Sequence, residues 1–126
     1  MVNQDNKNLK ILVIDDTKEM QQLIKMCLEM INQWSVITAE SGLHGIEIAE
    51  KENNLDLILL DYLMPKHNGE FTIKKLRSIP KISLIPVIFL TAQSDEKINW
   101  KKLGAKGVIY KPFNPLDLGC LIQEIL

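Results

Sequence analysis

The strongest constraint on the fold of this chain is a strict alternation between short apolar runs and stretches with helical periodicity. Runs such as "ILVI" and "LILL" do not alternate polar with apolar residues, which is typical of strands buried on both faces of a parallel sheet. Five strands are predicted in this way, over residues 9–14, 35–38, 55–60, 85–90 and 107–110.

Helical patterns fill the intervals between these runs. Apolar residues recur at three- and four-residue steps from Met20 to Ile31 and form one stripe. Near the end of the chain, Asn114 suits a helix N-cap and Pro115 the first helical position, before a second apolar stripe that reaches Ile125. Weaker patterns predict helices over residues 42–51, 70–79 and 95–103.

Five strands and five helices in alternation indicate an α/β fold, a parallel sheet covered by helices on both faces with right-handed crossovers. The chain has 126 residues, which predicts a single domain over residues 1–126 with a polar arm at residues 1–8. The net charge of −1 gives no reason to expect a nucleic-acid or membrane partner. The chain start has no apolar signal core, and Cys27 and Cys120 are far apart in helical patterns, so we expect reduced thiols and a cytoplasmic location.

Chemically reactive side chains stand at the ends of four of the five predicted strands. They are Asp15 and Asp16 after the first, Asp61 after the third, Thr91 after the fourth and Lys111 after the fifth. Each alone has an ordinary explanation, as a helix cap or as a solvated charge. In open parallel sheets, however, ligands bind beyond the carboxyl ends of the strands. If these strands are neighbours, all five side chains meet in one crevice.

The charges of this crevice predict its chemistry. Three close carboxylates repel one another, and Lys111 offsets only one of them. A divalent hard cation would offset the other two, and oxygen ligands without histidine or cysteine suit Mg²⁺. A metal, an ammonium group and a hydroxyl donor are the features that stabilise charge in phosphoryl transfer, and a carboxylate can act as the nucleophile. Asp61 is the best candidate, because Asp15 and Asp16 are placed as metal ligands.

The motifs "LVIDD", "LLDYLMPKHNG", "PVIFLTA" and "GAKGVIYKPF", in this order, resemble those of response-regulator receiver domains, of the single-domain chemotaxis type. The resemblance covers roughly residues 9–126 and implies a flavodoxin-like doubly wound (βα)5 fold with strand order 2-1-3-4-5. It implies a phosphorylation-dependent switch of two-component signalling, which catalyses only its own phosphorylation and dephosphorylation. The donor would be a histidine kinase or a phosphotransfer protein.

The resemblance also implies a role for each residue at the metal. Asp61 would accept the phosphoryl group. Asp16 would bind Mg²⁺ directly and Asp15 through water, and the backbone carbonyl of Leu63 would complete the protein's share of the coordination. The sequence "LLDYL" thus carries both the acceptor and one ligand.

Further residues are implied at the phosphate. Thr91 would supply the switch hydroxyl, with the backbone N–H of Ala92 beside it. Lys111 would contact the phosphate, and the peptide bond from Lys111 to Pro112 is expected to be cis. Phosphorylation would change the face formed by the fourth helix, the fifth strand and the fifth helix, for an output protein or effector domain that the sequence does not name.

One position departs from the family pattern. Many receivers carry Tyr or Phe three residues before the lysine, where this chain has Val108, while Tyr110 follows two residues later. Valine is small and stiff, so it cannot report by a large ring rotation. Our hypothesis is that phosphorylation still moves Thr91 and the loop after the fourth strand, without the aromatic part of the relay.

Three other interpretations stay open. A haloacid-dehalogenase-type phosphatase needs a second aspartate where this chain has Leu63, and a flavodoxin would place phosphate against "DDTKE", which repels it unless metal intervenes. A phosphorylation-independent interaction module usually lacks part of the pocket, which is complete here. His44 and His67 are expected at the surface, and the chain is either a stand-alone receiver or part of a longer protein.

Overall fold

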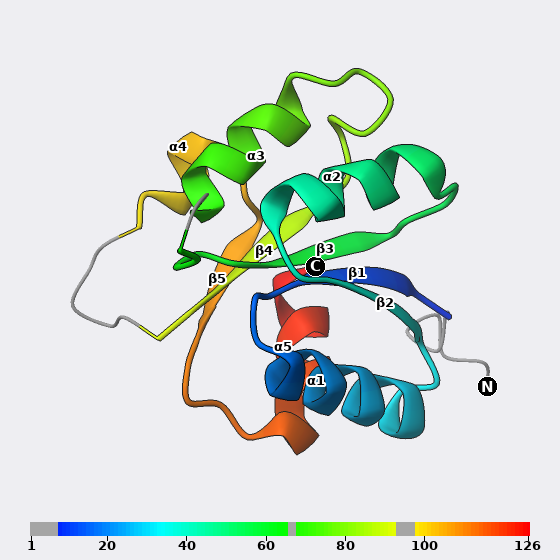
Figure 1. The fold of residues 1–126 in the computed structure, drawn as a ribbon. Helices are drawn as coiled ribbons and strands as arrows, with labels where there is room; N and C mark the ends of the chain where they lie inside the picture. Colours follow the sequence, from blue (N-terminus) through cyan, green and yellow to red (C-terminus); the bar gives the residue numbers. More distant parts are fainter. Residues whose placement is uncertain (1–7, 66–67, 93–97) are drawn as a thin grey trace.

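A computed structural model describes residues 8–65, 68–92 and 98–126. Within these residues, strands and helices alternate along the chain (Figure 1). The strands are β1 (Lys10–Ile14), β2 (Ser35–Ala39), β3 (Leu57–Asp61), β4 (Val87–Thr91) and β5 (Gly107–Tyr110). The helices are α1 (Lys18–Ile31), α2 (Gly42–Lys51), α3 (Gly69–Arg77), α4 (Trp100–Leu103) and α5 (Leu118–Ile125), and a 3₁₀ turn, η2 (Pro115–Asp117), precedes α5.

All neighbouring strands are parallel, in the order β2-β1-β3-β4-β5, which confirms the predicted flavodoxin-like order. β1 lies between β2 and β3, with Ile14 paired to Ala39 on one side and to Leu60 on the other. Asp61 pairs with Leu90, the residue before the end of β4. The carboxyl ends of β1, β3, β4 and β5 therefore meet along one edge of the sheet.

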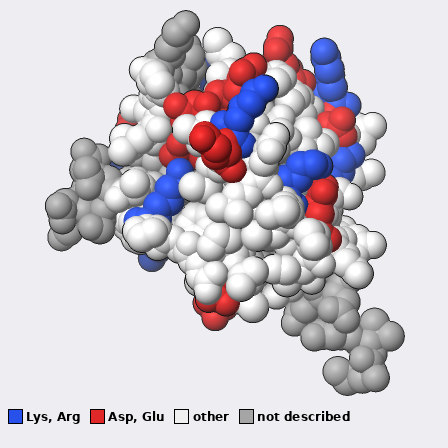
Figure 2. Space-filling model, turned by 60° about the horizontal axis from the view of Figure 1, so that its bottom comes forward, with Lys and Arg blue, Asp and Glu red and all other residues white. Residues whose placement is uncertain are grey.

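Two helical layers cover the sheet, with α2, α3 and α4 on one face and α1 and α5 on the other (Figure 1). Every residue of β3 and β4 is buried, which explains the unbroken apolar runs in the sequence. None of the helices in the described ranges is long and apolar enough to cross a membrane. On the face shown in Figure 2, acidic and basic side chains lie intermixed around an uncharged area.

Most element boundaries differ from the predicted ones by one or two residues, but the start of the last helix needs a correction. Asn114 caps the 3₁₀ turn instead of α5: its Oδ1 accepts a bond from the Leu116 N–H at 3.0 Å. The Asp117 N–H then bonds the Asn114 carbonyl at 2.9 Å, which closes a tight turn before α5 begins at Leu118.

Several other expectations concern single residues. Cys27 and Cys120 are both free thiols, the first buried and the second exposed. His44 is exposed as predicted, whereas His67, most of the polar arm and residues 95–97 of the predicted fourth helix lie outside the described residues. In the described part, α4 begins at Trp100, and the Asn99 side chain accepts a bond from the Lys102 N–H at 3.3 Å.

Candidate functional site: an acidic cluster at the sheet edge

The three predicted aspartates form one cluster. Asp15 and Asp16 follow β1, and Asp61 is the last residue of β3, the neighbouring strand. One carboxylate oxygen from each residue lies within 4.8 Å of the others. Asp15 is fully buried and Asp61 is 6% exposed, whereas Asp16 faces solvent. The parallel register of β1 and β3 therefore brings together acids that are far apart in the sequence.

Hydrogen bonds fix the Asp15 carboxylate on two sides. Its Oδ1 accepts bonds from the backbone N–H and the hydroxyl of Thr17, both at 2.9 Å. Its Oδ2 accepts a bond from Lys111 Nζ at 3.3 Å. Thr17 holds the N-cap position of α1 but makes no side-chain capping bond, so its hydroxyl serves Asp15 rather than the helix.

Gln21 supports this turn, and the sequence interpretation missed it. Its side chain is buried, and its amide Nε2 donates to the Asp15 carbonyl at 2.6 Å and to the Ala39 carbonyl at 3.5 Å. These bonds tie the end of β1 to the end of β2. The available signal was a polar residue directly beside Met20, at the start of the apolar stripe of α1.

Lys111 and Thr91 complete the site from β5 and β4. Lys111 Nζ lies 3.8 Å from Asp61 Oδ1, in addition to its bond to Asp15. The Lys111 N–H donates to the Thr91 carbonyl at 2.6 Å, and Thr91 is fully buried. The Lys111–Pro112 peptide bond is cis, as predicted. Ala92 follows Thr91 at the surface.

Burial dominates the electrostatics of Asp61. The pKa of its carboxyl is raised from 3.8 to about 7, chiefly by desolvation and in smaller part by the negative charges of Asp15 and Asp16. Lys111 opposes this rise, as does a hydrogen bond from the Leu63 backbone N–H. An additional positive charge beside Asp61 would therefore favour the ionised carboxylate.

The cluster fits a magnesium ion on these grounds. Its donors are carboxylate oxygens alone, which suits a hard divalent cation. Two of the three acids are buried, and Lys111 supplies the positive charge nearest to them in the described part of the chain. The exposed Asp16 leaves one side of the cluster open to solvent.

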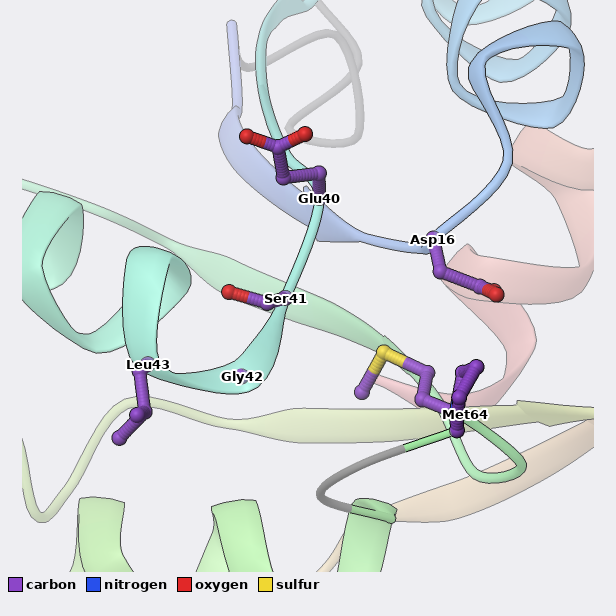
Figure 3. A pocket seen from close by; sticks show the side chains of 7 residues that line it. Asp16, Glu40, Ser41, Gly42, Leu43 and Met64 are labelled. Carbon is purple, nitrogen blue, oxygen red and sulfur yellow. The ribbon is translucent and has the colours of Figure 1, made fainter.

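A pocket of about 460 Å³ opens beside Asp16 (Figure 3). Its walls are the connection from β2 to α2 and the start of the connection from β3 to α3, where the Met64 side chain points toward Gly42. Ser41 caps α2 there, because its hydroxyl accepts a bond from the His44 N–H at 3.1 Å. Of the three clustered acids, the exposed Asp16 is the one that lines this pocket.

Val108, which stands where many receivers carry Tyr or Phe, lies on the face of the sheet covered by α2–α4. Val108 is half-buried and packs against the apolar cluster under these helices, as does Trp100 of α4. Tyr110 is 43% exposed at the end of β5, paired with Thr91 in the register of the two strands. The ring of Tyr110 therefore lies at the surface in this structure.

The model of the response regulator receiver domain family matches residues 11–123. This chain belongs to that family. The receiver domain is 40% identical, over 119 residues, to the transcriptional regulatory protein CpxR of Escherichia coli; the match covers 93% of this chain and 49% of CpxR. The chain thus spans about half the length of these curated relatives.

Other relatives match over nearly their whole length. A chemotaxis protein CheY homologue of Campylobacter jejuni is 31% identical over 120 residues, with 94% of this chain and 92% of that protein covered. Among solved structures, chemotaxis response regulator CheY4 of Vibrio cholerae superimposes with a TM-score of 0.85 at 30% identity, covering 95% of this chain and all of that chain. A receiver domain from Clostridium thermocellum gives 0.80 at 34% identity, with 93% of both chains covered. The receiver domain is therefore a module of two-component signal transduction.

Proposed function

We propose that this receiver domain, a single domain over residues 1–126, is a signalling switch that accepts a phosphoryl group on Asp61. The observation that carries the proposal is the placement of Asp61 at the end of a buried strand, between two further acids and 3.8 Å from the ammonium group of Lys111. A buried carboxylate is costly in free energy unless a counter-charge, a hydrogen bond or a metal ion offsets its charge. The donor would be a phosphohistidine of a kinase or of a phosphotransfer protein.

In the transfer, an Asp61 carboxylate oxygen forms a bond to phosphorus while the bond from phosphorus to the donor imidazole nitrogen breaks. The imidazole leaves with that electron pair, and the product is an acyl phosphate. Lys111 can approach the phosphoryl oxygens, since it already stands between Asp15 and Asp61. The Thr91 hydroxyl and the Ala92 N–H, at the end of the adjacent strand, are proposed as donors to the same oxygens.

Three protein groups beside Asp61 are proposed to hold Mg²⁺: Asp16 directly, Asp15 through water, and the Leu63 carbonyl. When bound, the ion would supply positive charge to Asp61 and to the phosphoryl oxygens. Asp15 is the better candidate for a water-mediated contact, because three hydrogen bonds already hold its carboxylate. The exposed Asp16 can turn toward the ion without breaking such bonds.

The output is proposed to be read at the face around α4, β5 and α5. A pocket of about 490 Å³ lies there, lined by residues of β5, of α5 and of the connection between them, which include Phe113, Leu121 and Ile125. Its lining mixes apolar side chains with polar ones such as Asp117 and Glu124, which suits a partner protein or effector domain that offers both kinds of group. Phosphorylation at Asp61 would change this face and with it the affinity for the partner.

Mass spectrometry after incubation with Mg²⁺ and acetyl phosphate tests the proposal. We expect the wild type to gain one phosphoryl group and Asp61→Asn to gain none. Asp117→Asn is the matched control, because Asp117 is an exposed aspartate that makes no side-chain capping bond to α5. Equal labelling of the wild type and Asp61→Asn would refute Asp61 as the acceptor.

A further inference from the structure

Arg77, the last residue of α3, joins two other segments through their backbone carbonyls. One guanidinium nitrogen, Nη1, donates to the carbonyls of Ser83 at 3.0 Å and Ile85 at 2.9 Å, in the connection that leads into β4. The other, Nη2, donates to the Gly104 carbonyl at 2.8 Å, at the end of α4. A planar guanidinium offers several donors in a fixed geometry, so one side chain holds both segments at once.

The backbone also fixes this end of α4. Gly104 has φ of 88°, a left-handed conformation that ends a helix and that other residues resist. Its N–H bonds the Lys101 carbonyl at 3.1 Å, and the Ala105 N–H bonds the Trp100 carbonyl at 2.9 Å. A Cβ atom at position 104 would stand 3.3 Å from Arg77 Nε, so the two residues are in close contact.

The opposite end of α4 is held differently. Ile98 is buried and Trp100 is half-buried, and both pack against the apolar cluster under α2–α4. The cap bond from Asn99 to Lys102 is internal to this segment. Apolar packing is not directional, so this end can shift along the sheet at a lower cost than the end bonded to Arg77. Along the sequence, residues 92–97 join this end to β4, the strand that carries Thr91.

We propose that Arg77 is a positioning residue that anchors the C-terminal end of α4, so that α4 pivots about Gly104 when Asp61 is phosphorylated. This inference rests on the proposed function. The small side chain of Val108 supports this proposal. Val108 packs against the same apolar cluster as Trp100 but cannot report phosphorylation by a large ring rotation. The conformational change would therefore reach the surface through α4 and its Trp100. The hydrogen bonds of the Arg77 side chain in the described ranges go to Ser83, Ile85 and Gly104, so Arg77 would act by fixing the C-terminal end of α4.

The two tryptophans of the chain provide the measurement. In ¹⁵N-labelled protein each indole N–H gives one NMR cross-peak, assigned with Trp34→Phe and Trp100→Phe. Trp34 is buried in the apolar cluster under α1 and α5, so it serves as an internal reference. Mg²⁺ and beryllofluoride, which mimics the phosphoryl group, should shift the Trp100 peak strongly and the Trp34 peak little.

Arg77→Lys keeps the charge but cannot bond both segments. In this variant we expect the Trp100 shift induced by beryllofluoride to fall by more than half, while the concentration of beryllofluoride that half-saturates the site is unchanged. Gly104→Ala loosens the same anchor from the other side and should give the same loss. Lys81→Met is the matched control. Lys81 lies in the connection between α3 and β4 and also donates to a backbone carbonyl, but this carbonyl belongs to Glu50 of α2 and not to α4.

The outcomes separate the two proposals. A Trp100 shift as large as that of the wild type in both Arg77→Lys and Gly104→Ala would refute the anchoring role of Arg77. An equal loss of the Trp100 shift in Lys81→Met would refute it as well. If beryllofluoride binds and the wild-type Trp100 peak stays in place, the pivot is wrong while the proposed function stands. If the wild type responds no more than Asp61→Asn, the proposed function fails and the pivot fails with it.

Discussion

Lys111 donates a hydrogen bond to the buried carboxylate of Asp15, at 3.3 Å. Its ammonium group stands 3.8 Å from Asp61 Oδ1, so its charge also reaches the proposed phosphate acceptor. The lysine is therefore shared between two acids, and Asp15 holds it at the distance of a hydrogen bond. A phosphoryl group on Asp61 would compete with Asp15 for this cation.

Removing the Lys111 charge should raise the pKa of Asp61 above its value of about 7, because Lys111 is the main group that lowers it. The measurement is an NMR titration of the Asp61 carboxyl carbon in Lys111→Met, with a chelator present. Lys106→Met serves as the control, since it removes an exposed lysine just before β5. A pKa in Lys111→Met equal to that of the wild type would contradict the shared arrangement.

Stability without metal should depend on pH through Asp61. Its folded-state pKa is about 7 and its ordinary value is 3.8, so between these pH values the folded state holds a proton that the unfolded state has lost. The wild type is thus destabilised progressively as pH rises from about 4 to about 7. Asp61→Asn lacks this cost and should be more stable than the wild type at pH 8, by on the order of 2–4 kcal/mol. The upper limit follows from the difference between the folded-state pKa and the ordinary pKa of Asp61, because each pKa unit corresponds to about 1.4 kcal/mol.

Urea unfolding of the wild type and Asp61→Asn across this pH range, with a chelator present, provides the check. The difference in the free energy of unfolding should be small near pH 4 and constant above the folded-state pKa. Added Mg²⁺ should reduce the difference, because it offsets the repulsion that Asp61→Asn relieves. A difference that does not change with pH would exclude Asp61 titration as its cause.

Asp16→Ala should remove most Mg²⁺ binding and leave the stability of the metal-free protein unchanged or slightly higher. Asp16 is the exposed member of the cluster, and its charge adds to the repulsion on Asp61. Calorimetric Mg²⁺ titration and urea unfolding measure the two effects. Glu40→Gln, which changes an acid of the same pocket outside the cluster, should keep Mg²⁺ binding. A sharp loss of metal-free stability in Asp16→Ala would mean that Asp16 is chiefly structural.

An ion pair on α1 hydrogen-bonds the backbone at the outer edge of β2, the edge strand of the sheet. The Ser35 N–H donates to the Leu9 carbonyl, on the side of β1. The backbone N–H and C=O of the next residue, Val36, therefore point away from β1, toward the outer edge of the sheet. Lys25 Nζ donates to the Val36 carbonyl at 2.8 Å, and the Val36 N–H donates to Glu29 Oε2 at 3.3 Å. Lys25 and Glu29 also bond each other at 2.8 Å. Lys25→Met with Glu29→Gln should open this edge to pairing with a second copy.

Sedimentation over a range of protein concentrations tests this edge prediction. The double variant should self-associate more than the wild type. The control is Lys74→Met with Glu70→Gln, which removes an equivalent pair at 2.9 Å on the exposed face of α3. Identical sedimentation of both double variants would show that the Lys25–Glu29 pair does not protect the edge.

Tyr110 should stay at the surface after phosphorylation. Its ring is 43% exposed in the structure, and Val108 holds the inward position one repeat earlier on the same face of β5. Comparison of free and beryllofluoride-bound crystal structures is the measurement. A large inward rotation of the Tyr110 ring, coupled to movement of Thr91, would show that the aromatic relay is kept by substitution.

The sequence by itself determined the alternation of strands and helices, because burial on both faces of a parallel sheet leaves unbroken apolar runs. It also determined which residues stand at the carboxyl ends of those runs, and hence that Asp15, Asp61 and Lys111 belong to one crevice once the strands are neighbours. These are properties of residues close together in the chain, so a local pattern is enough to find them.

Only the tertiary structure decided how those residues are paired and supported. The bond between Lys111 and Asp15 joins residues 96 positions apart, and the bond from Arg77 to Gly104 joins residues 27 positions apart. The buried amide of Gln21 likewise meets carbonyls at the ends of two strands. No local pattern encodes such contacts, because they depend on the packing of helices against a completed sheet, which sets the distance and the burial of each group.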